Sequence, residues 1–190
     1  MSAPEHRKDA PTSVRCAVIT ISDTRHEGND TSGDAIVALL TERGHAIAAR
    51  RIVRDDPSLV RDAVRAVDGT ADVVITTGGT GITARDSTYE AIQGLLRKRI
   101  DGFGELFRSL SYQEIGAAAM LSRAQAGVMD TAAIFALPGS EHAVRLAMTK
   151  LILPELGHVV RELQRQRPER SADPPRDSER GGGPASAEKS

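Results

Sequence analysis

The sequence predicts an α/β fold, a three-layer sandwich in which a mostly parallel central sheet carries helices on both faces. Short apolar runs alternate along the chain with segments of helical periodicity, which is the pattern of βαβ units. The first of these runs is continuously apolar, as expected for a strand that is buried on both faces. Polar loops follow the runs, at the edge where ligands bind in such sheets.

Four strands are predicted where aliphatic and β-branched residues gather without a helical period. They are Cys16–Ile21, Ala46–Val53, Asp72–Thr77 and Ala132–Leu137, the second being the weakest pattern. Right-handed crossovers between them would bring their carboxyl ends to one edge of the sheet.

Helices are predicted from capping residues and from apolar positions three and four apart. Thr31 or Ser32 is expected to N-cap the first helix, and Gly44 suits the position after its end. Asp56 and Pro57 open the second. Its inward residues are expected to be Leu59, Val60, Ala63, Val64 and Val67. Three more helices are predicted: Tyr89–Leu96, one marked by Val144, Ala147, Met148 and Leu151, and one that begins at Pro154. The stretch Ile100–Ala126 is predicted to be mostly helix and loop.

The chain has 190 residues, with 25 basic and 26 acidic side chains, which fits one domain with tails. Composition predicts a disordered leader at 1–13, a domain at 14–164 and a disordered tail at 165–190. Balanced charge, no Trp, 2 Tyr and 3 Phe argue against a nucleic-acid partner. A single Cys excludes a disulfide framework, and no apolar run reaches the ~18 residues of a membrane span. We therefore expect a cytoplasmic protein without a membrane partner.

The loops after the four strands carry the candidate functional residues. These loops are Ser22-Asp23 with Asp30–Gly33, then Asp55-Asp56, then Thr77–Thr88, and finally Pro138-Gly139-Ser140. In the third loop, three glycines within four positions let the backbone approach an anion and expose its N–H groups. A purely structural turn is the alternative. The loop lacks the Gly-Lys-Ser/Thr ending of a P-loop.

The third loop also matches the dinucleotide fingerprint through Gly79, Gly81 and Ala84. That fingerprint needs an acidic residue at the end of the next strand. The corresponding region, Lys98–Phe103, follows no predicted strand. A nicotinamide-dependent dehydrogenase is therefore kept only as an alternative.

Asp55 and Asp86 are the candidate metal ligands. They lie 31 residues apart, about one βα unit, so neighbouring strand ends could bring both carboxylates beside the glycine loop. Magnesium is usually held by one or two carboxylates together with substrate phosphates. Asp56 is better explained as a helix N-cap, and Glu90 is either a supporting residue or a solvated one.

Three further positions have a simpler structural explanation beside the functional one. Ser140 could bind a ligand oxygen or only cap a helix, and Arg123 beside Ser122 is a weak candidate for an anion contact. Cys16 lies in an apolar strand and is expected to be buried rather than nucleophilic. No two histidines have metal-ligand spacing.

Five runs together are more specific than any single motif. They are VITISDTRHEGNDTSGDAI, VITTGGTGITARDSTYEAI, GFGELFRSLSYQEIG, MLSRAQAG and IFALPGS. In this order they resemble the MoaB/MogA family of molybdenum cofactor biosynthesis proteins, and LPGS and GGTGIT are more similar to its MoaB branch. The resemblance implies a homotrimer or hexamer and molybdopterin and Mg-ATP as substrates. It implies adenylylated molybdopterin and pyrophosphate as products, and other cofactor-biosynthesis proteins as partners.

The resemblance also implies roles for individual residues. Asp55 and Asp86 would bind Mg²⁺ and act in adenylyl transfer, with Ser122 as a catalytic residue at the pterin site. The nucleotide- and pterin-binding residues would be Ser22, Asp23, Thr77, Gly78, Gly79, Thr80, Gly81, Pro138, Gly139 and Ser140. Some MoaB-type members lack the transferase activity, so a non-catalytic molybdopterin-binding protein is the alternative. Asp at both 55 and 86 favours an active protein.

Overall fold

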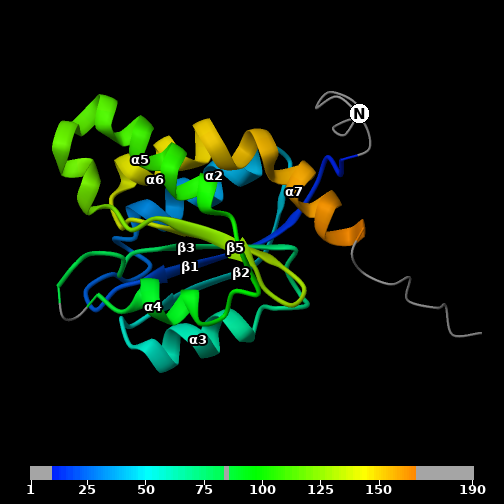
Figure 1. Cartoon of the computed structure of the whole chain (residues 1–190). Coiled ribbons are helices and arrows are strands. Elements are labelled where there is room, and N and C mark those ends of the chain that lie inside the picture. The colour runs from blue at the N-terminus through cyan, green and yellow to red at the C-terminus, as the bar shows by residue number, and fades with distance from the viewer. Residues whose placement is uncertain (1–9, 84–85, 166–190) are drawn as a thin grey trace, which may run out of the picture.

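The protein is described by a computed structural model, which covers residues 10–83 and 86–165. A sheet forms the middle layer between helices (Figure 1). It has six strands, in the order β2-β1-β3-β6-β5-β4. Four of these strands are parallel to one another: β1 (Arg15–Ile21), β2 (Ala46–Val53), β3 (Val73–Thr77) and β6 (Ala133–Leu137). They are the four predicted strands, so the parallel part of the sheet is confirmed.

Helices cover both faces of the sheet (Figure 1). One face carries α2 (Thr31–Glu42), α5 (Asp101–Ile115), α6 (Glu141–Ala147) and α7 (Leu153–Arg165). The other carries α3 (Pro57–Arg65) and α4 (Thr88–Gln93). Alternate residues of the strands serve the two cores: Val18 and Ile75 pack on the first side, and Ile19 and Val74 on the second. The three-layer α/β sandwich is therefore confirmed.

Two strands at the far edge of the sheet were not predicted. β5 (Gln125–Val128) pairs antiparallel with β6, and β4 (Lys98–Arg99) pairs antiparallel with β5. The region Ile100–Ala126 is otherwise α5 followed by a 3₁₀ segment, η1 (Gly116–Leu121). β4 can approach because Gly127 has no side chain: a Cβ there would lie 2.5 Å from the Lys98 carbonyl oxygen.

The first two helices differ from the prediction in one detail each. Asp30, rather than Thr31 or Ser32, N-caps α2, and its carboxylate accepts the Gly33 N–H at 3.0 Å. This carboxylate is fully buried, where the Thr20 hydroxyl and Arg50 also donate to it. Leu59 is 45% exposed and does not face the core, whereas the other inward residues predicted for α3 are buried.

The last two helices are continuous. A π-helical segment, η2 (Met148–Ile152), joins α6 directly to α7, and the Leu153 N–H bonds the Met148 carbonyl. Pro154 therefore lies in the first turn after a π bulge rather than at a fresh helix start. The wider turn fits a residue that has no N–H to donate to the helix.

The described residues begin at residue 10, before the start of the predicted domain at 14. The Ser13 hydroxyl donates to the Gly44 carbonyl at 2.8 Å, and the Pro11 carbonyl lies against Gly157 of α7. The rest of the predicted leader, 1–9, and the tail from 166 lie outside the described residues. Within the described part of the chain, no helix is both long and apolar enough to cross a membrane.

Candidate functional site

The carboxyl ends of the four parallel strands meet at one edge, and direct contacts join their loops. The Ser22 N–H bonds the Val53 carbonyl at 2.8 Å, which links the ends of β1 and β2. The Gly78 N–H bonds the Leu137 carbonyl at 3.1 Å, and the Thr77 hydroxyl bonds the Pro138 carbonyl at 2.9 Å. The first loop therefore adjoins the end of β2, and the third loop adjoins the fourth. We call this edge of the sheet the rim.

The glycine loop after β3 lies closely against its neighbours. Gly78 has φ +103°, and a Cβ on it would lie 2.1 Å from the Ile21 carbonyl oxygen. Gly79 has φ +64°, and a Cβ there would lie 2.6 Å from a carboxylate oxygen of Asp55. Only glycine fits at either position, because the backbone angle and the space both exclude a side chain.

Asp55 follows β2 and its side chain reaches the start of α4. Its Oδ1 accepts hydrogen bonds from the Ser87 hydroxyl at 3.1 Å, the Ser87 N–H at 3.5 Å and the Thr88 hydroxyl at 3.4 Å. Burial raises the pKa of Asp55, the Ser87 bonds oppose that shift, and the nearby Asp86 charge adds to it. The carboxylate is thus held in place yet destabilised in its charged form.

Asp86 lies over the last glycine of the same loop. Its Oδ2 accepts the Thr83 hydroxyl at 2.6 Å and the Thr83 N–H at 2.9 Å, and a Cβ on Gly81 would lie 2.6 Å from that oxygen. The bond from the Thr83 hydroxyl is the main reason that the pKa of Asp86 is lowered. The two predicted carboxylates therefore both lie against glycines of the same loop, Asp55 at Gly79 and Asp86 at Gly81, and the charge of Asp86 contributes to the raised pKa of Asp55.

This donor set fits a magnesium ion that is completed by phosphate oxygens. No group of three or more His, Cys, Asp and Glu side chains suited to a metal occurs in residues 10–83 and 86–165. The hydrogen bonds above use Oδ1 of Asp55 and Oδ2 of Asp86. Oδ2 of Asp55 and Oδ1 of Asp86 accept none of the bonds named above, although Oδ2 of Asp55 lies against Gly79 and the Gly81 N–H also interacts with the Asp86 carboxylate. Two carboxylates and substrate phosphates are the usual ligands of Mg²⁺.

Ser122 lies just before β5, whose start adjoins the carboxyl end of β6. Its hydroxyl oxygen is buried and has no hydrogen-bond partner within the described part of the chain. Buried polar atoms are rarely left unpaired, so this hydroxyl suits a bound ligand. The neighbouring Arg123 is not free for the anion contact considered from the sequence, because its donors are directed at backbone carbonyls of the glycine loop.

Several predicted site residues are engaged in local structure at this edge. Ser140 N-caps α6 by accepting the Ala143 N–H at 3.2 Å, and Asp56 N-caps α3 as predicted. The Ser22 hydroxyl accepts two N–H groups of its own turn. Asp23 pairs with Arg54 at 3.4 Å. These contacts explain their positions without a ligand and leave a binding role as a prediction.

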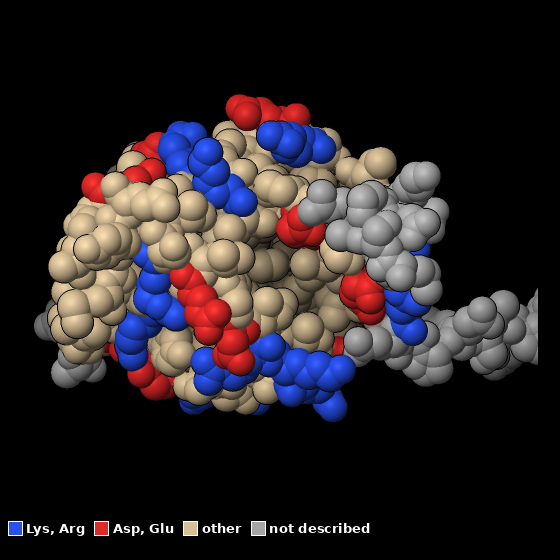
Figure 2. All heavy atoms as spheres, turned by 45° about the horizontal axis from the view of Figure 1, so that its top comes forward, with Lys and Arg blue, Asp and Glu red and all other residues tan. Residues whose placement is uncertain are grey.

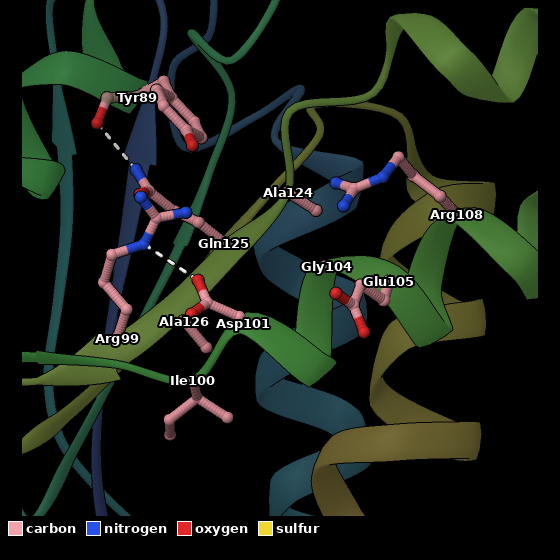
Figure 3. Close-up of a pocket in the computed structure, with 10 residues that line it drawn as sticks. All are labelled: Tyr89, Arg99, Ile100, Asp101, Gly104, Glu105, Arg108, Ala124, Gln125 and Ala126. Atoms are coloured by element: carbon pink, nitrogen blue, oxygen red, sulfur yellow. Dashed lines mark hydrogen bonds and ion pairs between the residues drawn. The ribbon is translucent and has the colours of Figure 1, made fainter.

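Two hollows adjoin the rim. One, of about 450 Å³, lies between α3 and the glycine loop and is lined by Pro57, Arg61, Ile82, Thr83, Asp86 and Arg123, among others. The other, of about 260 Å³, lies between α5 and β5 (Figure 3). Basic and acidic side chains are interspersed over the face shown in Figure 2. That face therefore has no broad basic surface.

Sequence reasoning did not assign roles to Ser87 or Thr88, and it considered Arg123 only for an anion contact. Ser87 and Thr88 hold Asp55 in place. Their position before a helical pattern could have identified them as a helix start, but not as partners of a residue 32 or 33 positions away. The dinucleotide alternative also fails here, because β3 neighbours β1 and β6 rather than the next strand, β4. Ala84 of that fingerprint lies outside the described residues.

Comparison with known proteins identifies the family. A family described as "Probable molybdopterin binding domain" matches residues 17–158. Molybdenum cofactor biosynthesis protein B of Bacillus anthracis is 54% identical over 169 residues, which cover 87% of this chain and 100% of that protein. The chain belongs to the MoaB/MogA family.

Solved structures of this family have the same fold. A crystal structure of Molybdenum cofactor biosynthesis protein B superposes with a TM-score of 0.80 at 55% identity, over 83% of this chain and 99% of that one. The tungsten cofactor synthesizing protein MoaB from Pyrococcus furiosus gives a TM-score of 0.75 at 40% identity, over 82% and 99%. The family and the similarity to its MoaB branch are therefore as the sequence motifs predicted.

Proposed function

We propose that this MoaB/MogA-family protein acts in molybdenum cofactor biosynthesis, where it transfers the adenylyl group of Mg-ATP to the phosphate of molybdopterin. The observation that supports this most directly is the placement of Asp55 and Asp86 on one glycine loop, each in contact with a glycine of it. The names of the relatives support the pathway, since they are cofactor biosynthesis proteins.

The chemistry needs charge compensation more than it needs a general base. The nucleophile would be a phosphate monoester, which is mostly dianionic at neutral pH because its second pKa is ~6. A phosphate oxygen attacks the α-phosphorus of ATP, a new P–O–P bond forms, and the bond to the leaving pyrophosphate breaks. No proton has to be removed from the nucleophile. The difficulty is the repulsion between two polyanions.

The residues of the rim are suited to that difficulty. Mg²⁺, held by Asp55 and Asp86 with the triphosphate, would neutralise charge on the reacting phosphates. The N–H groups of the loop Thr77–Gly81 would bind phosphate oxygens, which aligns the α-phosphorus for attack. The buried Ser122 hydroxyl would donate to an oxygen of molybdopterin, which would give it the partner that it lacks among the described residues.

The resemblance adds three further elements to the proposal: self-association as a homotrimer or hexamer, partner proteins from the same pathway, and a cytoplasmic location. Exposed apolar side chains on α5 and η1 support self-association. They are Leu106, Tyr112, Ile115, Met120 and Leu121, each more than half exposed. Unpaired apolar surface of this kind is typical of an interface.

A second candidate is a non-catalytic protein that binds molybdopterin. It is favoured by the similarity to MoaB-named relatives, since the resemblance implies that some MoaB-type proteins lack the transferase. This candidate predicts molybdopterin binding without release of pyrophosphate from Mg-ATP.

The test is incubation of the protein with molybdopterin and Mg-ATP, followed by detection of adenylylated molybdopterin and pyrophosphate. We expect turnover by the wild-type protein and a loss on the order of 10²-fold or more in Asp86→Asn, the usual cost of one electrostatic group. Asp130→Asn is the matched control, because Asp130 precedes β6 at the opposite edge of the sheet and pairs with Arg97. Unchanged transfer by Asp86→Asn would refute the assignment of Asp86.

A further inference from the structure

The Arg123 side chain crosses from the segment before β5 to the loop after β3. Its Nε donates to the Thr80 carbonyl at 3.1 Å, and its Nη2 donates to the Asp86 carbonyl at 3.1 Å. The same Nη2 also donates to the Gly81 carbonyl. One guanidinium therefore joins Thr80 and Gly81 of the glycine loop to Asp86, the second candidate metal ligand.

The rest of the guanidinium is engaged as well. Nη1 pairs with Glu90 of α4, and the cation lies over the Tyr89 ring, 5.0 Å from its centre. Gln125, two residues after Arg123, donates to the Tyr89 carbonyl at 2.6 Å, a contact that Figure 3 shows. Two residues that follow Ser122 therefore contact Tyr89: Arg123 lies over its ring, and Gln125 binds its carbonyl.

These contacts decide between two roles for Arg123. A guanidinium has five N–H donors, and the contacts above use four of them on the protein itself. The side chain is only 24% exposed. A phosphate-binding arginine needs a free pair of donors, so the geometry fits a residue that fixes the loop rather than one that holds the substrate.

We propose that Arg123 is a positioning residue, whose fork of donors sets the glycine loop, Asp86 and Ser122 in one fixed arrangement. The proposal builds on the adenylyl transfer proposed above. Arg123 is covalently joined to Ser122 and hydrogen-bonded to the Asp86 backbone, so one residue links the pterin side of the site to the metal side. Lysine cannot replace it, because a single ammonium cannot reach carbonyls on two sides of a loop at once.

The kinetic test compares Arg123→Lys, Arg123→Gln and Glu90→Gln with Arg97→Gln as the control. Arg97 also pairs with an acidic side chain, Asp130, but at the opposite edge of the sheet, where both side chains are more than half exposed. We expect kcat to fall on the order of 10²-fold in both Arg123 variants, as for a misplacement of about 1 Å, with KM for molybdopterin nearly unchanged. Glu90→Gln should keep kcat within about twofold, because the Glu90 side chain is 60% exposed and its loss leaves the carbonyl contacts of Arg123 in place. Arg97→Gln should also keep kcat within about twofold, because an exposed ion pair contributes little. Wild-type kcat in Arg123→Lys, or a rise in KM alone, would overturn the proposal.

A second measurement does not depend on catalysis. The N–H groups of Thr83, Asp86 and Thr88 are bonded within the loop, to the Asp86 carboxylate and to the carbonyls of Thr83 and Gly79. In Arg123→Gln we expect their hydrogen exchange to rise about tenfold or more, as local opening becomes easier. Exchange in β3 and β6, and all exchange in Arg97→Gln, should stay unchanged.

The two measurements separate the two proposals. If the wild-type protein makes no adenylylated product, the transferase proposal fails, and the exchange experiment still decides whether Arg123 fixes the loop. Unchanged exchange at Thr83, Asp86 and Thr88 in Arg123→Gln would overturn the positioning role, whatever the activity of the wild-type protein.

Discussion

Replacement of Gly79 by alanine is the sharpest single test of the site's packing. At φ +64°, a Cβ on this residue would lie 2.1 Å from the Thr88 hydroxyl oxygen and 2.6 Å from Oδ2 of Asp55. Both atoms belong to the arrangement that holds the Asp55 carboxylate. The substitution therefore acts on a candidate metal ligand without changing the ligand itself.

The size of the effect follows from that geometry. A left-handed backbone costs alanine about 1–2 kcal/mol more than glycine. In addition, the Thr88 hydroxyl must retreat by about 1 Å to restore ordinary contact, and a 1 Å misplacement near reacting groups costs on the order of 10²-fold in rate. Gly44 supplies the control: it has φ +77°, and a Cβ on it would meet no atom within 4 Å, so Gly44→Ala carries the backbone cost alone.

The assay combines urea unfolding with adenylyl transfer. Both variants should lose about 1–2 kcal/mol in unfolding free energy from the backbone term, and Gly79→Ala should lose more because of the steric contacts. Only Gly79→Ala should lose transfer, by on the order of 10²-fold. Wild-type turnover in Gly79→Ala, together with a stability loss equal to that of Gly44→Ala, would refute the reasoning.

Two further predictions follow from pKa values. Because burial raises the pKa of Asp55 in the folded protein, its charged form opposes folding at neutral pH. In urea unfolding at pH 7, Asp55→Asn should be at least as stable as the wild type. As the pH falls through the raised pKa, the unfolding free energy of the wild type should increase relative to that of the variant. A decrease would contradict the raised pKa of Asp55. Burial raises the pKa of the Cys16 thiol to about 12, so a thiol reagent at pH 8 should label it only after denaturation, and rapid labelling of the native protein would show that the thiol is accessible.

The parallel part of the sheet could be predicted because its signal is local. β1, β3 and β6 are short apolar runs, and burial on both faces demands such runs in a parallel sheet. Asp56 and Gly44 were also predictable, since capping depends on the residue type and its immediate neighbours.

The unpredicted elements depend on partners distant in the chain. β5 reads Gln-Ala-Gly-Val, which has little intrinsic strand preference, and it forms because β6 offers its free edge. Asp30 caps α2 in place of its neighbours because Thr20 and Arg50 bind its carboxylate in the core. The position of Leu59 on α3 fits the apolar spacing of a buried face, but the face that packs on the sheet is formed by Val60, Ala63 and Val64, and Leu59 stays exposed.

In the candidate site, too, local motifs were predictable and contacts between residues distant in the chain were not. The motifs identified Asp55, Asp86 and the glycine loop, and strand order explains why they meet at one edge. The role of Arg123 could not be predicted, because an arginine beside a serine gives no indication of which carbonyls it binds more than 35 residues away.

The central claim is tested most directly by mixing molybdopterin, Mg-ATP and the wild-type protein and measuring pyrophosphate together with adenylylated molybdopterin. We predict equal amounts of the two products, dependence on Mg²⁺, and a loss on the order of 10²-fold or more in Asp86→Asn. Molybdopterin binding without either product would contradict the claim and favour a binding protein.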